Sequence, residues 1–303
     1  MAEGDEGGTR RRVPLTGPYD LGASLILGDY GRRNPILRWV SPTELHRATH
    51  TPEGPASVRV IVEPSAGRIE AEAWGPGREW VLDELPIHLG LDDEAPELPG
   101  KAGELQRRAP GLRRGRCLDL FELVVSYIIR QRVAWRDAVT TQSAIHRARG
   151  QVAPGPLDLR LPLDGDEWGA MTTADLAGFG LERKRAKTLL SLAARANRVR
   201  SWARLPAPEF ARRLESFTGI GGWTRAMVQG HGLAEHDVVP LGDDGLPSSV
   251  SWFFAGEARA DDARMLELLA PYAGQRFRVI HLLWVAGEGA PRFGPRIRGA
   301  KPS

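Results

Sequence analysis

The spacing of apolar residues has a period of two in the first part of the chain. Residues 57–75, SVRVIVEPSAGRIEAEAWG, contain two alternating runs joined by a Pro-Ser-Ala-Gly turn at 64–67. This pattern predicts a β-hairpin with one buried face. The preceding segment 18–28, PYDLGASLILG, is expected to supply another strand or a helix. A small mixed domain should therefore open the fold.

The spacing becomes helical after residue 119. In the run 120–129, LFELVVSYII, apolar side chains recur at i, i+1, i+4, i+5 and i+8, which is one face of an α-helix. Between the two patterns, residues 90–100, GLDDEAPELPG, have no period and several breakers, so they are the predicted linker. Beyond it the chain should be essentially all α, with further helices predicted at 175–176, 184–196, 208–216, 224–231, 260–269 and 275–285.

These patterns divide the chain into three segments. Residues 1–16 are predicted to be a flexible basic tail outside the fold, because glycine and charge dominate them. Residues 17–95 should form the N-terminal mixed α/β domain, and residues 96–303 a helical domain with a basic C-terminal tail. At 303 residues the chain is long for a single core, so two or three lobes with a cleft between them are expected.

Composition excludes several classes of protein. Hydrophobic residues make up 42% and charged residues 26%, as in an ordinary globular protein, and no apolar run approaches the length of a membrane span. The segment 1–14, MAEGDEGGTRRRVP, has no apolar stretch after its basic cluster, so a secretory signal is not expected. A cytoplasmic location is expected instead. The single cysteine, Cys117, excludes an internal disulfide and a four-cysteine zinc or iron–sulfur site within the chain.

The basic residues are mostly arginine. The formal net charge is only +3, but the sequence pI is about 9.3 and lysine occurs at four positions only. Arginine in excess fits a partner made of phosphates. A chain rich in Arg, Ala and Gly is equally what a GC-rich genome encodes, so composition alone leaves both interpretations open.

The most informative segment is 214–246, LESFTGIGGWTRAMVQGHGLAEHDVVPLGDDGL. Its glycine turn, residues 217–222, lies between two predicted helices. Glycines permit positive φ and let a ligand approach the backbone. The following helix presents unpaired N–H groups and the positive end of its dipole, so the turn suits a phosphate. Standing alone, such a turn more often only ends a helix.

A second pattern follows in the same connection, Val-Pro-Leu-Gly-Asp-Asp-Gly-Leu at 239–246. Together the two patterns resemble the signature of helix-hairpin-helix DNA glycosylases, of the bacterial alkylation-repair (3-methyladenine) type. The resemblance covers residues 105–284. It includes PGLR at 110–113 with the helix FELVVSYIIRQRV, LAGFGLERKRA at 176–186, and PYAGQRFRVIHLLW at 271–284.

The resemblance implies a fold and an activity. The fold is α+β, with a small antiparallel-sheet domain followed by an all-α core of two lobes and the active site in the cleft between them. The activity is that of a monofunctional hydrolase, which flips a damaged, alkylated base out of double-stranded DNA and hydrolyses its N-glycosidic bond in base excision repair. Trp223 stands where bifunctional members carry a nucleophilic lysine, so no lyase step is implied. A monomer in the bacterial cytoplasm, associated with the nucleoid and not with a membrane, is expected.

The resemblance assigns the catalytic carboxylate to Asp243. A carboxylate there would stabilise the positive charge that develops on the deoxyribose. Asp244 is its neighbour, and Asp237 is assigned only a structural or capping role. The alternative for Asp243 and Asp244 is a solvated acidic turn that caps the next helix.

The resemblance also implies a base pocket. Trp223, Met227, His281 and Trp284 are its predicted members, because aromatic faces attract an electron-poor alkylated base by stacking and cation–π attraction. The second stacking aromatic corresponds to either His281 or Trp284. Core packing is an equal alternative for Trp284. Met227 departs from the aromatic residue that relatives often carry.

DNA contacts are expected from the glycine turn and from a wedge loop. The wedge loop contains Gln131 and Arg132. The Arg132 side chain either stacks in the vacated gap, contacts a phosphate or is simply solvated. A Na⁺ or K⁺ ion held by the carbonyls of the turn is a further expectation, and no other metal or cofactor is. Two basic clusters, at 183–187 and 292–301, are candidate phosphate contacts. The predicted residues of the turn are Phe217, Thr218, Gly219, Ile220, Gly221, Gly222 and Thr224.

Two other functions fit part of the pattern. A non-catalytic helix-hairpin-helix protein would bind DNA without releasing bases. A helical scaffold, in which the glycine turn is only a turn, would show no salt-dependent DNA binding.

Overall fold

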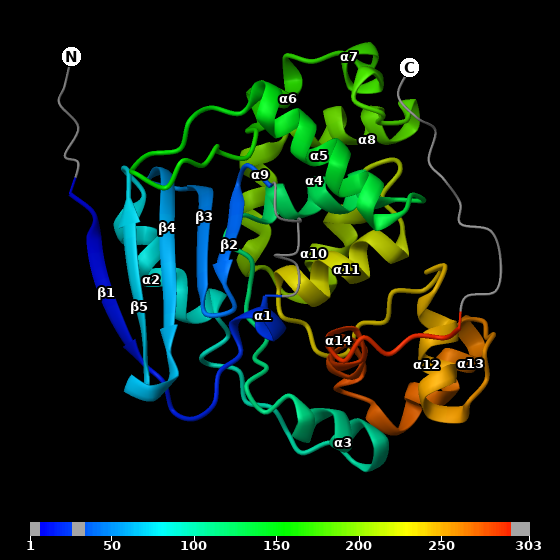
Figure 1. The fold of residues 1–303 in the computed structure, drawn as a ribbon. Coiled ribbons are helices and arrows are strands. Elements are labelled where there is room, and N and C mark those ends of the chain that lie inside the picture. The colour runs from blue at the N-terminus through cyan, green and yellow to red at the C-terminus, as the bar shows by residue number, and fades with distance from the viewer. Residues whose placement is uncertain (1–6, 26–33, 292–303) are drawn as a thin grey trace, which may run out of the picture.

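The structure is a computed structural model that describes residues 7–25 and 34–291. It places an antiparallel sheet beside a larger group of helices (Figure 1). The sheet has five strands in the order β1-β5-β4-β3-β2. The strands are β1 (Thr9–Pro14), β2 (Leu37–Ser41), β3 (Glu44–Thr51), β4 (Gly54–Glu63) and β5 (Arg68–Trp74).

The predicted β-hairpin is confirmed as β4 and β5. They pair antiparallel in the register Val60↔Ala71, and the turn is a short 3-10 helix, η2 (Pro64–Ala66), closed by a left-handed glycine. Alternate side chains of β4 are buried on the face that packs against helix α2 (Arg78–His88). The opposite face is partly covered as well, because the loop 150–162 packs onto its end near Trp74.

Strand β1 corrects the prediction of a flexible tail at residues 1–16. Residues 9–14 pair with residues 68–73 of β5. Ion pairs between β1 and β5 support this pairing. Nε of Arg10 lies 2.9 Å from Oε1 of Glu72, and Nε of Arg12 lies 2.8 Å from Oε1 of Glu70. The charge that suggested a solvated tail thus belongs to the exposed face of an edge strand. Residues 1–6 lie outside the described residues.

Beyond residue 96 the described chain is helical, as predicted, apart from one isolated bridge between Val152 and Arg160. A short helix, α1 (Leu21–Ser24), also precedes β2. The helices are α3 (Gly100–Arg108), α4 (Leu120–Arg130), α5 (Trp135–Arg149), α6 (Gly165–Gly169), α7 (Thr173–Gly178), α8 (Arg183–Ala193), α9 (Ala196–Arg200), α10 (Ala207–Glu215), α11 (Gly222–Gly232), α12 (Leu246–Ala255), α13 (Asp262–Leu269) and α14 (Arg276–Val285), with 3-10 turns η3 (Ser201–Arg204) and η4 (Ala270–Tyr272).

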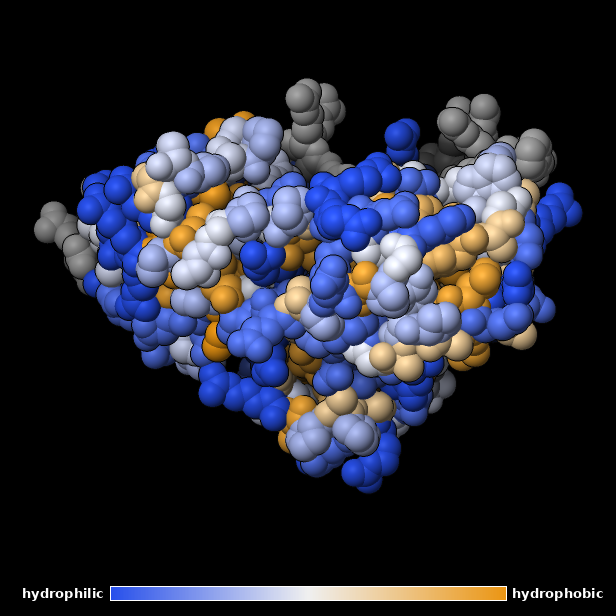
Figure 2. All heavy atoms as spheres, turned by 90° about the horizontal axis from the view of Figure 1, so that it is seen from below, coloured by the Kyte–Doolittle hydropathy of each residue, from blue (hydrophilic) through white to orange (hydrophobic). Residues whose placement is uncertain are grey.

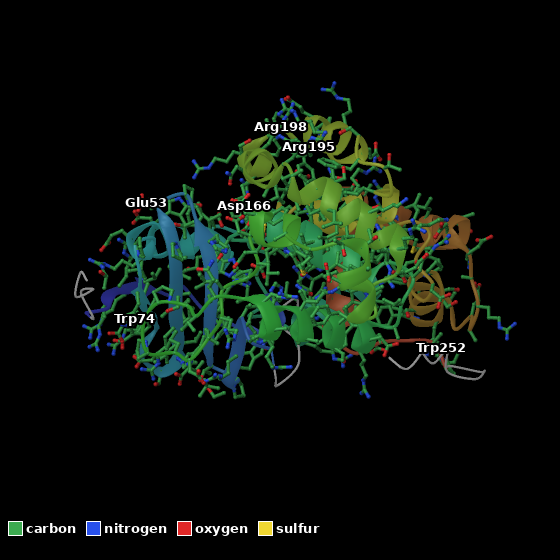
Figure 3. The ribbon with its side chains drawn as sticks, turned by 90° about the horizontal axis from the view of Figure 1, so that it is seen from above. Glu53, Trp74, Asp166, Arg195, Arg198 and Trp252 are labelled. Carbon is green, nitrogen blue, oxygen red and sulfur yellow. The ribbon has the colours of Figure 1, made fainter. Side chains whose placement is uncertain are left out.

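The helices form two apolar clusters. One is built around α4, whose residues 120–129 are all buried, together with α8, α10 and α11. The other joins α3, α12, α13 and α14. Helix α14 belongs to both, because Phe277 packs in the first and Val279 in the second. Seen from above, Trp74 of the sheet and Trp252 of α12 mark opposite sides of the molecule, with the first cluster between them (Figure 3).

The predicted linker lacks helix and strand from residue 90 to 99, but it is not simply solvated. The side chain of Asp93 is 1% exposed and forms a paired contact with Arg278 of α14, at 2.9 Å and 2.5 Å. Burial alone would raise the pKa of Asp93, but the hydrogen bonds and charge of Arg278 outweigh it and lower that pKa. The connection is therefore clamped to the helical domain.

Within the described ranges, no helix is both long and apolar enough to cross a bilayer. On the face seen from below, apolar residues form separate patches among hydrophilic ones (Figure 2).

Candidate active site

Asp243 lies in the connection between α11 and α12, just after a turn at Gly242 with φ of 77°. Its Oδ1 accepts the backbone N–H groups of Gly245 (3.0 Å) and Leu246 (2.9 Å). Its Oδ2 accepts the indole N–H of Trp223 at 2.8 Å. The side chain therefore caps α12, as the structural alternative expected, and is also fixed from a second direction by Trp223.

The neighbouring carboxylates differ from Asp243. Asp244 is exposed, whereas Asp243 is half-buried. Asp237 ties its loop to α14, since its Oδ1 accepts the backbone N–H of Gly274 (2.7 Å) and its carboxylate pairs with Arg276. The Arg276 contact lowers the pKa of Asp237. This is the structural role that the sequence indicated.

An aromatic cluster continues from Trp223 into the protein. The ring of Trp223 meets Tyr127 edge-on at 5.9 Å, and the Tyr127 hydroxyl lies 2.7 Å from Nδ1 of His231. His231 stacks on Trp284 at 5.5 Å with an interplanar angle of 27°. Trp223, Met227 and His231 stand at i, i+4 and i+8, so one face of α11 carries the cluster.

The two candidates for the second stacking aromatic lie in different surroundings. Trp284 is half-buried and belongs to the cluster. His281 is 3% exposed, and its Nε2 donates to the carbonyl of Ala23 in α1 at 2.9 Å. Burial, with Arg114 nearby, lowers the pKa of His281 to about 3, so this side chain is a neutral group held against the N-terminal domain. Met227 is buried in the same core as Trp223.

The glycine turn uses its glycines in two ways. Gly219 has φ of 93°, and a Cβ there would come 2.1 Å from Oγ1 of Thr188, which donates to the carbonyl of Thr218 at 3.0 Å. Gly221 and Gly222 would have nothing within 4 Å of a Cβ, and Gly221 is extended. Of the two reasons expected for these glycines, positive φ applies to Gly219, and open space beside the backbone is found at Gly221 and Gly222.

The bare backbone of the turn leads directly into α11. Gly221 is its N-cap residue and has no side chain to satisfy the first N–H groups. Phe217 and Ile220, 5% and 6% exposed, anchor the turn in the core beneath. The N-terminus of α11 is therefore exposed, and the turn before it is anchored in the core.

Gln131 connects the predicted wedge loop to this turn. Its Nε2 donates to the carbonyl of Gly219 and to Oγ1 of Thr224, both at 2.9 Å. Arg132, next to it, is exposed and has a positive φ of 55°. The two elements that the sequence assigned to DNA therefore meet in space.

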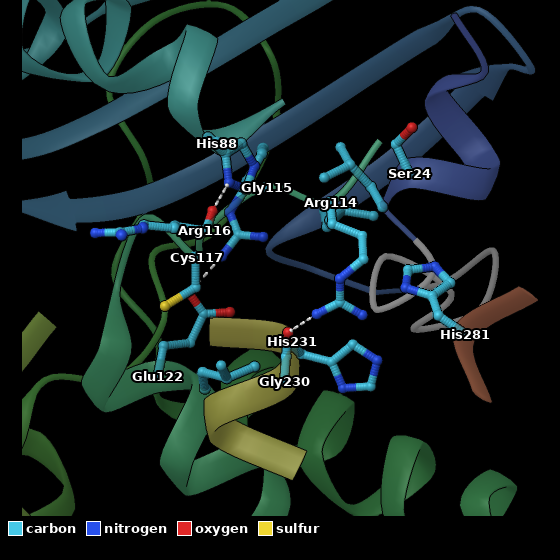
Figure 4. A pocket seen from close by; sticks show the side chains of 14 residues that line it. Ser24, His88, Arg114, Gly115, Arg116, Cys117, Glu122, Gly230, His231 and His281 are labelled. Atoms are coloured by element: carbon cyan, nitrogen blue, oxygen red, sulfur yellow. Dashed lines mark hydrogen bonds and ion pairs between the residues drawn. The ribbon is translucent and has the colours of Figure 1, made fainter. Parts of the chain in front are cut away.

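A cavity between the sheet domain and the helices contains groups that the sequence analysis missed (Figure 4). Arg114 is 4% exposed and lies over the ring of Phe277 at 4.6 Å. His231 and His281 line the same cavity. The spacing of His231 along α11 from Trp223 was a signal that could have identified it, whereas nothing in the sequence distinguished Arg114 from its neighbours.

The basic clusters are not uniform surfaces. Arg183, Lys184 and Lys187 are exposed, but Arg185 is buried and its guanidinium donates to the carbonyl of Ile129 at 2.6 Å. The second cluster, Arg292, Arg296, Arg298 and Lys301, lies outside the described residues. Among residues 7–25 and 34–291, no three His, Cys, Asp or Glu side chains are grouped so as to hold a metal ion.

Comparison with known proteins finds no matching family model and no matching curated protein. Solved structures do match. A 3-methyladenine DNA glycosylase from Archaeoglobus fulgidus is 22% identical with a TM-score of 0.78, over 90% of this chain and 97% of the other. An 8-oxoguanine glycosylase/lyase from Clostridium acetobutylicum, in complex with double-stranded DNA, is 15% identical with a TM-score of 0.67, over 95% and 97%.

A third match is the 3-methyladenine DNA glycosylase of Schizosaccharomyces pombe in complex with abasic DNA. It is 18% identical with a TM-score of 0.51, and it covers 62% of this chain and 91% of the other. These likenesses show that the chain has the fold of helix-hairpin-helix DNA glycosylases, as the sequence resemblance implied, with the expected N-terminal sheet.

Proposed function

We propose that this protein is a monofunctional DNA glycosylase that hydrolyses the N-glycosidic bond of a damaged base. One observation carries the proposal: on a glycosylase fold, Asp243 is held by Trp223 and by two backbone N–H groups at the start of α12, those of the N-cap residue Gly245 and of Leu246. Three hydrogen bonds fix the direction of a carboxylate that remains half-exposed, so its charge can face a bound sugar.

The proposed chemistry is a hydrolysis. The bond between C1′ and the base nitrogen breaks with its electron pair going to the base, and positive charge develops on the sugar. The Asp243 carboxylate stabilises that charge more in the transition state than in the ground state. Water then bonds to C1′ and loses one proton, and an abasic site with a C1′ hydroxyl remains. A neutral base takes up that proton as it leaves, whereas a cationic alkylated base leaves as a neutral molecule and the proton passes to solvent. The flipped base must be accommodated in the protein, since the bond is inaccessible within the duplex.

No covalent imine with the enzyme forms in this scheme. The resemblance places Trp223 where bifunctional members have lysine, and an indole cannot act as an amine nucleophile. Its N–H instead donates to Asp243. The same side chain therefore orients the acid and removes the lyase route.

DNA is proposed to bind at the glycine turn and the wedge loop. The N-terminus of α11 and the bare backbone at Gly221 suit a phosphate oxygen. The carbonyls of Thr218 and Gly219 each accept a side-chain hydrogen bond, from Thr188 and Gln131. A carbonyl oxygen has two lone pairs, so these two could also hold a Na⁺ or K⁺ ion facing the same phosphate. No other cofactor is proposed, and one protein chain is expected for each lesion.

The resemblance proposes alkylated bases, so alkylated DNA is the first substrate to test. The structural neighbours are named for two damaged bases, 3-methyladenine and 8-oxoguanine. The class of base must therefore follow from the pocket of this chain.

Base release tests the proposal. The protein is incubated with damaged genomic DNA, freed bases are identified by mass, and parallel samples are treated with borohydride. We expect free bases, intact strands and no trapped adduct. DNA binding without release from any damaged DNA would favour the non-catalytic alternative, and a lysine-dependent adduct would exclude a monofunctional enzyme.

A further inference from the structure

A row of aromatic side chains lies behind Trp223 and joins α11 to α4 and α14. Trp223 is half-buried, and its indole N–H donates to Oδ2 of Asp243 at 2.8 Å. A tryptophan side chain has several staggered rotamers, and only some of them direct the N–H at this carboxylate. A group that fixes the ring of Trp223 therefore also fixes one of the three hydrogen bonds that orient Asp243.

Tyr127 of α4 meets the ring of Trp223 edge-on. It is 1% exposed, and the two rings have centroids 5.9 Å apart and an interplanar angle of 78°. Aromatic pairs prefer this edge-to-face arrangement. Helices α4 and α11 lie side by side (Figure 1), so the contact joins two neighbouring helices of the same core.

The hydroxyl of Tyr127 is fixed in turn by His231. It lies 2.7 Å from Nδ1 of His231, and the two rings are nearly parallel, at 7°, with centroids 6.0 Å apart. Phe277 and Trp284 of α14 hold the imidazole, the first edge-on at 4.9 Å and the second stacked at 5.5 Å. Burial lowers the pKa of His231 well below its usual value, so at neutral pH this hydrogen bond joins two neutral groups.

Helix α4 also fixes the backbone around Trp223. Gln131 follows Tyr127 by four residues, so the two side chains lie on one side of α4. Nε2 of Gln131 donates to the carbonyl of Gly219, before Trp223, and to Oγ1 of Thr224, directly after it. Helix α4 thus holds the chain on both sides of Trp223 through Gln131, and the ring of Trp223 through Tyr127.

Packing alone does not require the polar groups of the Tyr127–His231 pair. Residues 120–129 of α4 are all buried, and a phenylalanine at position 127 would fill nearly the same volume. A buried hydroxyl needs a hydrogen-bond partner, which here is a buried imidazole. A directional bond in a core fixes the orientation of a ring more closely than apolar contacts do.

Resting on the glycosylase function above, we propose that Tyr127 and His231 are positioning residues for Asp243. Their hydrogen-bonded pair holds the indole of Trp223 at the angle from which its N–H reaches Oδ2 of Asp243. They act through Trp223 and not on the sugar or the base. Their loss should therefore slow the chemical step and leave the affinity for DNA unchanged.

Two other roles for the pair predict different results. A pair that only stabilises the core would change the free energy of unfolding and leave the Trp223 N–H as it is. A Tyr127 side chain that touches the flipped base would affect excision even in a protein without the indole N–H. The experiments below separate these roles from positioning.

The hydrogen bond of Trp223 is measured first, without any substrate. The chain contains nine tryptophans, and in protein with nitrogen-15 in its indoles the N–H resonance absent from Trp223→Phe belongs to Trp223. Tyr127→Leu should move this resonance toward that of a free indole and speed its exchange with water, because the bond to Asp243 is weakened. Asp243→Ala removes the acceptor and gives the reference. An unchanged Trp223 resonance in folded Tyr127→Leu would overturn the inference.

Base release measures the consequence for the reaction. Single-turnover release is followed on whichever of methylated or oxidised genomic DNA the wild-type protein acts on. Tyr127→Leu should slow release about tenfold, close to the loss in Trp223→Phe, and Tyr127→Phe, which keeps the ring, about threefold. Affinity for a duplex with a tetrahydrofuran abasic site should stay at the wild-type value. No release from either DNA by the wild type would overturn the proposed function, while the Trp223 resonance would still decide the positioning.

A double-mutant cycle tests whether the effect passes through Trp223. In the Trp223→Phe background the indole N–H is absent, so Tyr127→Leu should cost no further rate. Losses that multiply in the double variant would show that Tyr127 acts independently of the indole N–H. That result would overturn the inference and leave the glycosylase function standing.

Tyr272→Phe is the matched control. Tyr272 is also a buried tyrosine, 8% exposed, but it packs on Phe254 at 5.3 Å in the cluster of α3, α12, α13 and α14. Loss of its hydroxyl should leave both the Trp223 resonance and the rate of release unchanged.

A further substitution covers the case in which Tyr127→Leu does not fold. His231→Leu removes the partner of the Tyr127 hydroxyl, so it should change the Trp223 resonance and the rate of release as Tyr127→Phe does. Folded Tyr127→Phe and His231→Leu proteins with the wild-type resonance and the wild-type rate would overturn the inference.

Discussion

Asp243 contacts the first turn of α11 and Arg114 contacts the last, and the two charged groups are held in different ways. Asp243 is half-exposed, and three hydrogen bonds from the protein orient it. Arg114 is 4% exposed, yet two of its three guanidinium-group nitrogens have no partner in the described structure. The protein itself orients the Asp243 carboxylate, whereas the Arg114 guanidinium keeps buried N–H groups without an acceptor among the described residues.

This difference determines what a substitution of each kind of group should change. A group that stabilises developing charge must be in place beforehand, since reorganisation during the reaction would cost rate. Substitution of the half-buried Asp243 should therefore change the chemical step, whereas substitutions of buried polar groups should change stability.

Acidification should have the largest effect, because it lowers the free energy of unfolding through buried histidines. Burial lowers the pKa of His88, His146 and His281 to about 3 each, so they are neutral when folded. In the unfolded chain they titrate near 6.5, so stability is complete above that pH and is lost as pH falls from 6.5 toward 3. At pH 5 each histidine should cost about 2 kcal/mol.

Urea unfolding at pH 7 and pH 5 measures this loss. His88→Leu and His281→Leu should each remove about 2 kcal/mol of the difference between the two pH values. A free energy of unfolding that is equal at both pH values would show that these histidines are not buried as neutral groups.

The second largest effect is expected from replacing Asp243, and it should appear in the rate of excision. Asp243→Asn removes the charge while keeping an oxygen for the N–H groups of α12, so excision in single turnover should slow on the order of 100-fold. DNA affinity should hold or rise, because a negative charge facing a polyanion is deleted. The free energy of unfolding should change less with this substitution than with acidification of the buried histidines.

Two controls sharpen this result. Asp244→Asn should retain most activity, since Asp244 is exposed. Trp223→Phe removes the N–H that reaches Asp243 and keeps an aromatic ring, so it reports what orientation alone contributes. An inactive Asp244→Asn beside an active Asp243→Asn would shift the catalytic position by one residue.

The smallest effect is expected at the glycine turn. Gly221→Val places its side chain in open space, so the urea midpoint should be unchanged, while duplex affinity should fall about tenfold because DNA can no longer approach the backbone. Gly219→Ala provides the contrast, since its φ of 93° and Thr188 should make it unstable. Wild-type affinity of Gly221→Val at physiological salt would remove the turn from the DNA interface.

Regular, local patterns in the sequence predicted much of the fold. The alternation in β4 and β5 and the apolar stripe of α4 can be recognised in the sequence, because burial of these elements makes apolar residues recur at a regular spacing. The resemblance brought Asp243, Trp223 and the glycine turn together, and they do lie together in the structure. Gln131 was assigned to the same region and bonds directly to Gly219.

What the sequence could not predict depends on contacts distant along the chain. Strand β1 looks like a charged tail until Glu70 and Glu72 of β5 are placed beside it. Arg114 is one of several arginines in a row and becomes distinctive only when α11 and α14 bury it. Helix α5 carries few apolar residues at helical spacing, so its amphipathic pattern was too weak to see.

Strand β1 has a consequence for the solution behaviour of the protein. It forms one outer edge of the sheet and carries three successive arginines, residues 10–12. An open sheet edge invites a strand from another molecule, and a row of charged side chains discourages that pairing. Removing residues 1–14 would uncover the backbone of β5 instead, so the shortened chain should self-associate during concentration while the intact chain stays dispersed.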